Sequence, residues 1–267
     1  MLGQKRIYIF TGKGGVGKTT LSLALTKHLA DSGKKVLFCE FDQQSVKPLA
    51  QKLNIPYLNL EINSSAEEYV GNKLGSKTVA HWIMKTPFFS ALFKMVPGLA
   101  NMILLGHMID MLLHDEDLTI VLDSPSSGHA LTMLESPFNF KEMFGSGIIV
   151  NDIERMEKFI KKEDGFLISV ISLPSLMAVT EAKELQSGIT KLGYKNTQVI
   201  ANDLYGLTSD IKDNFNALPE FMKMKIDLEK EVIKNLDTTT SMEVAHIFDN
   251  EMENVVNVLA PIMGGKI

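Results

Sequence analysis

The stretch FTGKGGVGKTT, residues 10–20, has the residue types of a phosphate-binding loop. Gly12, Gly17, Lys18 and Thr19 complete the pattern G-x-x-x-x-G-K-[ST]. Glycines let backbone N–H groups approach phosphates, the lysine reaches the β- and γ-phosphates, and the threonine hydroxyl is a ligand for Mg²⁺. The sequence therefore predicts a site for a nucleoside triphosphate. We expect this site to include Gly12, Lys13, Gly14, Gly15, Val16, Gly17, Lys18, Thr19 and Thr20.

A second lysine, Lys13, stands at the mouth of the same loop. Two lysines on one set of phosphates would repel each other, so Lys13 is better placed if it points outward to the nucleotide of another molecule. A cation supplied across an interface raises the rate of phosphoryl transfer by about 10³- to 10⁵-fold where it has been assigned. We favour this role for Lys13, and a solvated loop lysine is the alternative.

The elements that must position this loop are short apolar runs that alternate with helical patterns. The runs, which we interpret as strands, are 6–10, 35–41, 118–123, 166–172, 197–202 and 221–226. The helical patterns are 19–31, 45–53, 128–135, 176–192, 209–216 and 242–259. This alternation predicts an α/β fold with a mainly parallel, doubly wound sheet, whose ligand binds at the carboxyl ends of the strands.

The alternation is broken between residues 64 and 114, which have helical periodicity and no convincing strand. We expect an all-helical subdomain over about residues 63–114, inserted into a nucleotide-binding core of residues 1–62 and 115–267. The chain is then a single P-loop domain of 267 residues.

Two aspartates stand at the ends of predicted strands. Asp42 follows KVLFCEF and is suited to hold an attacking water, whereas Asp123 ends TIVLD and is suited to the Mg²⁺ site. Either aspartate alone is equally well explained as an ordinary strand-end or cap residue. Two strand-end carboxylates that converge on a phosphate loop favour the functional interpretation.

Several motifs resemble one known family. GKGGVGKT is similar to the deviant phosphate loop of the MinD, ParA, nitrogenase iron protein and ArsA class. DSPSSGHALTMLESPFNFKEMF, residues 123–144, resembles the D-x-P-x-T-G-H switch of bacterial ArsA-related ATPases. Further segments similar to that family are YLNLEINSSA, PGLANMILLGHMIDML and SLPSLMAVTEAKEL.

The resemblance implies a Mg²⁺-dependent ATPase that binds ATP and ADP. In the family, two subunits close face to face over the nucleotide, and the extra lysine, here Lys13, crosses the interface. The partner implied is an identical subunit or an ArsA-like paralogue, with a conformational change that acts on a protein client. The resemblance also implies that Asn202 reads adenine, and a turn residue after a strand is the alternative.

The sequence departs from the family pattern at three places. DQQS, residues 42–45, replaces D-P-A-x-N, and serines flank Pro125, so we expect slow or partner-tuned hydrolysis. The arsenite pump uses a cluster of thiols, and the relatives that target tail-anchored proteins bind zinc through C-x-x-C. Cys39 is the only cysteine, so the chain can form neither site, and we expect it to pack inside a strand.

Composition restricts the partners and the location. A formal net charge of −5 argues against nucleic acid as the main partner. The most apolar window, residues 94–113, is interrupted by polar residues, so we expect no transmembrane segment. With one cysteine and no apolar leader ahead of the phosphate loop, we expect a cytoplasmic protein.

Two alternative functions are also compatible with the sequence. A MinD- or ParA-type positioning switch would be favoured by a basic amphipathic C-terminal helix, but the tail from His246 is acidic. A regulatory subunit of low activity that pairs with a paralogue would keep the fold.

The chain has 15 methionines, and Met84, Met95, Met102, Met108 and Met111 lie close together in the sequence. They either pack the helices together or form a groove for a hydrophobic protein client.

Overall fold

The strand-like runs of the sequence form one sheet of seven parallel strands, in the order β3-β2-β4-β1-β5-β6-β7. The computed structural model describes residues 5–41, 46–87, 91, 93, 95–96, 98–125, 127–144, 148–234, 236 and 241–266. The strands are β1 Ile7–Gly12, β2 Val36–Phe41, β3 Tyr57–Leu60, β4 Thr119–Asp123, β5 Phe166–Ser172, β6 Thr197–Leu204 and β7 Ser241–Ala245. The predicted α/β fold with a parallel sheet is therefore confirmed.

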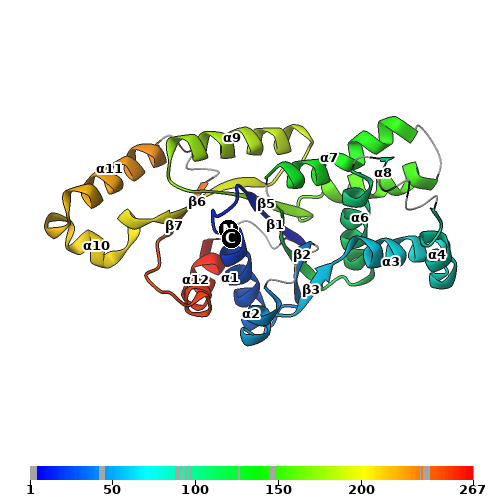
Figure 1. Cartoon of the computed structure of the whole chain (residues 1–267), viewed down its shortest axis with the longest axis horizontal. Coiled ribbons are helices and arrows are strands. Elements are labelled where there is room, and N and C mark those ends of the chain that lie inside the picture. The colour runs from blue at the N-terminus through cyan, green and yellow to red at the C-terminus, as the bar shows by residue number, and fades with distance from the viewer. Residues whose placement is uncertain are drawn as a thin grey trace.

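Helices cover both faces of this sheet (Figure 1). Those of the first half are α1 Lys18–Asp31, α2 Lys47–Lys52, α3 Ile62–Leu74, α4 Lys77–Met84 and α6 Leu99–His114. Those of the second half are α7 Ser127–Phe144, α8 Ile148–Ile160, α9 Leu176–Lys191, α10 Ser209–Asp213, α11 Glu220–Lys234 and α12 Met252–Lys266. α1, α2 and α12 lie on one side of the sheet, and α7, α8 and α9 lie on the other (Figure 1).

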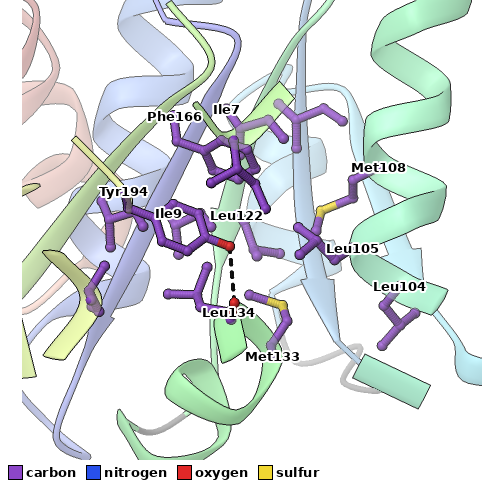
Figure 2. Packing of buried hydrophobic residues seen from close by; sticks show 14 of the residues in the cluster. Ile7, Ile9, Leu104, Leu105, Met108, Leu122, Met133, Leu134, Phe166 and Tyr194 are labelled. Carbon is purple, nitrogen blue, oxygen red and sulfur yellow. Dashed lines mark hydrogen bonds between the residues drawn. The ribbon is translucent and has the colours of Figure 1, made fainter. Parts of the chain in front are cut away.

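Alternation along β1 divides the core into two layers. Ile7 and Ile9 face the layer that contains α6, α7, α8 and α9, whereas Tyr8 and Phe10 face the layer that contains α1 and α12. All four side chains are buried, as expected for a central parallel strand covered on both faces. Figure 2 shows the first layer, where the Tyr194 hydroxyl also donates to the Leu134 carbonyl at 3.2 Å.

The predicted helical segment forms α3, α4 and α6, between β3 and β4. α6 is apolar around most of its circumference, so it is buried between the sheet and its neighbouring helices. Met102 and Met108 lie in the core, and Met84 and Met111 pack against it, whereas Met95 is 77% exposed. Packing therefore accounts for four of these five methionines. Phe88 and Phe89, next to them in sequence, lie outside the described residues.

The strand expected at 221–226 is wrong, because these residues belong to the helix α11. The apolar residues Phe221, Met224 and Leu228 have helical spacing and lie on the exposed face, whereas Ile226 and Val232 are buried. The alternation of FMKMKI covers too few residues to outweigh the spacing of the longer segment.

The helix expected at 242–259 is also wrong at its beginning. Residues 241–245 form β7, with Met242 and Val244 buried against the sheet, and α12 begins only at Met252. The strand β3 and the helix α8 were not predicted. β3 is a short edge strand in which only Leu60 is fully buried, so its sequence has a weak strand pattern.

Candidate nucleotide site

The phosphate loop connects the end of β1 at Gly12 to the start of α1 at Lys18. Gly12 has φ 141°, and a Cβ atom there would lie 2.3 Å from the Ile171 carbonyl oxygen of β5. Gly17 has φ 94° and caps the N-terminus of α1. Only glycine fits these two positions without strain, and the helix N-terminus carries a partial positive charge that attracts anions. The loop therefore has the geometry of an anion site.

Asn202 contacts this loop from β6, which is separated from β1 by β5 in the sheet. Its Nδ2 donates to the Val16 carbonyl at 2.9 Å, and a Cβ atom on Gly17 would lie 2.3 Å from the same nitrogen. Asn202 lies inside the strand, so the alternative of a turn residue is wrong. The structure brings Asn202 to the loop, and its contact with adenine stays a prediction.

Thr19 and Asp123 meet at the center of the site. The Thr19 hydroxyl, in the first turn of α1, donates to Asp123 Oδ2 at 2.5 Å, and Asp123 is the last residue of β4. Asp123 Oδ1 is buried without a hydrogen-bond partner among the described residues. Burial raises the pKa of Asp123 to about 6, although the Thr19 hydroxyl and the charge of Lys18 oppose this shift. A hydroxyl and a carboxylate oxygen are the kinds of ligand that Mg²⁺ prefers.

Lys18 lies across the loop, where its Nζ donates to the Lys13 carbonyl at 2.9 Å. Burial lowers the pKa of Lys18, and the nearby Asp123 carboxylate acts in the opposite direction. The neighbouring Thr20 faces elsewhere, since its hydroxyl contacts Met252 Sδ of α12 at 3.2 Å. Thr19 and Lys18 are thus directed to one site, and the predicted part of Thr20 in that site stays a prediction.

Lys13 turns away from Lys18 and toward α9. Its Nζ pairs with Glu181 at 3.2 Å, and its side chain is 64% exposed. The separation of the two lysines agrees with the repulsion expected between them. An exposed pair of this kind contributes roughly 0–1 kcal/mol, so it is easily exchanged for another partner.

A cavity of about 620 Å³ opens beside the loop. Its lining includes Lys18, Thr19, Asp123 and the switch residues Ser124, Pro125 and His129. The cavity lies at the carboxyl ends of β2 and β4, where parallel α/β sheets bind ligands. Asp42, with the rest of DQQS, lies outside the described residues, so its role in holding water stays a prediction.

Comparison with known proteins agrees with this geometry. The model of a family described as anion-transporting ATPase, ArsA ATPase, matches residues 5–162, more than half of the chain. The chain belongs to the ArsA ATPase family. It is therefore an ATPase of the P-loop class.

The curated relatives are distant in sequence. A putative arsenical pump-driving ATPase 2 of Aquifex aeolicus is 23% identical over 275 residues, which cover 87% of this chain and 88% of the relative. The ATPase BagA of Mycobacterium tuberculosis is 24% identical over 220 residues, which cover 74% of this chain and 64% of the relative. An arsenical pump-driving ATPase of Acidiphilium multivorum is 34% identical over 73 residues, only 22% of this chain and 12% of the relative.

One residue of this ArsA-type site was missed in the sequence. Glu40, near the end of β2, lines the same cavity and is only 3% exposed. The Tyr57 hydroxyl of β3 donates to its carboxylate, and burial raises the pKa of Glu40. The sequence did contain a signal, because Glu40 is the single charged residue within the apolar run VLFCEF. Side chains alternate along a strand, so Glu40 lies on the same face of β2 as Phe38.

The single cysteine of the chain has a packing role. Cys39 is fully buried in β2, and burial raises the pKa of its thiol.

Among the described residues, none of the helices combines the length and the apolar character that crossing a bilayer requires.

Proposed function

We propose that this chain is a Mg²⁺-dependent ATPase that closes as a dimer on ATP and acts on a protein partner. The observation that carries the proposal is the Thr19–Asp123 contact at 2.5 Å beside Lys18, with Asp123 Oδ1 buried and unpartnered among the described residues. Thr19 and Asp123 would hold the Mg²⁺ ion. When bound, the ion offsets the negative charge that develops on the transferred phosphoryl group.

The chain's own residues supply the remaining parts of phosphoryl transfer. The loop N–H groups and the N-terminus of α1 bind the phosphates, and Lys18 exchanges the Lys13 carbonyl for the β- and γ-phosphate oxygens. Asp42 holds the attacking water. Asn202 contacts adenine, since its amide already lies against the loop that holds the phosphates.

The proposed dimerisation depends on the exposed position of Lys13. In the proposed closed state Lys13 leaves Glu181 and reaches the phosphates of the second subunit, which is identical or an ArsA-like paralogue. The pair that breaks is exposed, and the charge-assisted contacts that form are partly desolvated, so the exchange favours closure. ATP and ADP would therefore stabilise different arrangements of the dimer in the cytoplasm.

The helical segment, residues 63–114, is the part that we propose to act on a client. The switch residues Ser124, Pro125 and His129 line the cavity. Ser124 and Pro125 precede α7, His129 lies within it, and α7 packs against α6. Trp82 and Met95 are 74% and 77% exposed, and they give this part of the molecule an apolar surface. A hydrophobic protein segment is the partner that such a surface would bind.

Phosphate release by the purified chain tests the catalytic proposal. Hydrolysis should require Mg²⁺ and should be lost in Asp123→Asn, while the surface variant Asp117→Asn keeps it. Equal hydrolysis with Mg²⁺ and with EDTA would contradict the proposed cation site. A protein that binds ATP with Mg²⁺ but turns over only with a paralogue would be the regulatory subunit instead.

Hydrogen exchange tests the client proposal separately. Residues 82–113 should change their protection between the ADP and the ATP-analogue states, and a peptide with an apolar helix should bind in only one of them. Equal protection in both states, with no peptide bound, would mean that these helices serve packing alone.

A further inference from the structure

Glu40 is a buried carboxylate in the wall of the nucleotide cavity, and the proposed function so far gives it no role. It is 3% exposed and lines the same cavity as Lys18 and Asp123. An ionised carboxylate is unfavourable in such a place unless it is paired and hydrogen-bonded. Its presence there calls for a reason beyond packing.

The register of the sheet puts Glu40 beside Asp123. β2 and β4 are parallel neighbours, and Glu40 is the residue directly opposite Asp123. Side chains of opposite residues on neighbouring strands project from the same face, so both carboxyl groups enter the cavity together. Among the described lining residues, Lys18 alone carries a permanent positive charge, and the proposed function uses it for the phosphates.

Glu40 is also held in a fixed position. The Tyr57 hydroxyl and the Val46 backbone N–H both donate to its carboxylate. The Tyr57 ring stacks on Phe38 of β2, with ring centroids 6.3 Å apart and an interplanar angle of 19°. The carboxylate is thus oriented by β3 and by the residue that precedes α2.

Hydrogen bonding alone does not require a carboxylate at this position. The amide oxygen of a glutamine could accept from the same hydroxyl and the same N–H group. What glutamate adds is negative charge, which repels ATP when no cation is present and attracts a divalent cation when one is. Mg²⁺ keeps several waters and binds few carboxylates directly, so a neighbouring carboxylate can act on it from the outer shell.

We propose that Glu40 is a positioning residue for the divalent cation, acting beside Asp123 from the outer shell and held there by Tyr57. The inference rests on the proposed function, because it assumes that ATP binds together with Mg²⁺. It adds a second carboxylate to the site and a reason for the Tyr57 hydroxyl.

The test is the coupling between Mg²⁺ and nucleotide binding, measured without turnover. The Kd of a fluorescent, non-hydrolysable ATP analogue is measured with saturating Mg²⁺ and with EDTA. The Kd in EDTA divided by the Kd in Mg²⁺ is the ratio that gives the coupling. Glu40→Gln should lower this ratio about 10-fold or more. Binding should weaken with Mg²⁺ and should stay equal or tighten in EDTA, since one repulsive charge is gone.

Two further variants separate charge from scaffolding. Tyr57→Phe keeps the charge but removes one hydrogen bond, so it should lower the ratio by less than Glu40→Gln. Glu163→Gln removes an exposed carboxylate that precedes the amino-terminal end of β5 and does not line the cavity, so it should leave the ratio unchanged. If Glu40→Gln does not fold, as judged by circular dichroism, Tyr57→Phe decides: a ratio below that of the wild type supports the proposal, and an unchanged ratio contradicts it.

A purely structural Glu40 gives a different pattern. Binding would then weaken equally with Mg²⁺ and with EDTA, and the unchanged ratio would overturn the inference. If the wild type itself binds equally well in both solutions, the proposed Mg²⁺ site is wrong. A large ratio that is the same in wild type and Glu40→Gln leaves the proposed function intact and removes only the role of Glu40.

Discussion

The phosphate loop and helix α6 use their side chains in different ways. Around the loop, polar groups contact one another, as in the Thr19–Asp123 and Asn202–Val16 hydrogen bonds. In α6, most side chains are apolar and buried between the sheet and the neighbouring helices. Residues of the loop line the cavity, whereas fully buried residues of α6 such as Met108 contribute to the stability of the fold. Substitutions in the two regions should separate turnover from stability.

The largest effect is expected for Lys18→Ala. Phosphoryl transfer depends on positioning and on charge stabilisation, so loss of this ammonium should reduce turnover by about 10³-fold. The free energy of unfolding should change by no more than about 0.5 kcal/mol, since Lys18 is only partly buried. Phosphate release and urea denaturation measure the two quantities. Lys34→Ala, at an exposed position, is the control, and a large loss of stability in Lys18→Ala would break the separation.

Met108→Ala should give the opposite result. Met108 is fully buried in α6, so truncation leaves a cavity and should lower the free energy of unfolding by about 3 kcal/mol. Met95→Ala, at a side chain 77% exposed, should change it by less than about 0.5 kcal/mol. Turnover per folded molecule should stay the same in both variants. A fall in turnover of folded Met108→Ala would show that the packing of α6 also controls the rate of hydrolysis.

Asp42→Asn sharpens the comparison within the site itself. If Asp42 holds the attacking water, turnover should fall by about 10²-fold while the Kd for an ATP analogue stays near that of the wild type. Phosphate release and equilibrium titration give the two values. Undiminished turnover would remove Asp42 from the mechanism.

The smallest effect is expected for Glu181→Gln, which releases Lys13 from an exposed ion pair. The pair is worth less than about 1 kcal/mol, so stability should hardly change, and dimerisation with an ATP analogue should tighten by less than about 5-fold. Lys13→Ala should instead impair dimerisation. Sedimentation with and without the analogue measures the dimerisation of both variants, and Glu184→Gln of the same helix is the control. A monomer under all conditions would exclude the homodimer and leave the heterodimer.

The parts of the site that could be predicted are those written in local sequence. Gly12, Gly17, Lys18 and Thr19 act through backbone conformation and neighbouring positions, so their spacing was sufficient. Asp123 was found because it ends a clear strand.

The strand expected at 221–226 was wrong because a short alternating pattern fits both a strand and a helix. The longer segment has helical spacing of its apolar residues, and it forms α11.

Sequence by itself determined the α/β class, the phosphate loop and the second lysine, because each depends on residue types close together in the chain. Only the tertiary structure decided which distant residues meet. Glu40 lies opposite Asp123 because β2 pairs with β4, and Asn202 reaches Val16 because β6 lies in the same sheet as β1. The burial of Met102 and Met108 likewise follows from the packing of α6. Strand pairing and helix packing join segments far apart in sequence, and no local pattern specifies which segments these are.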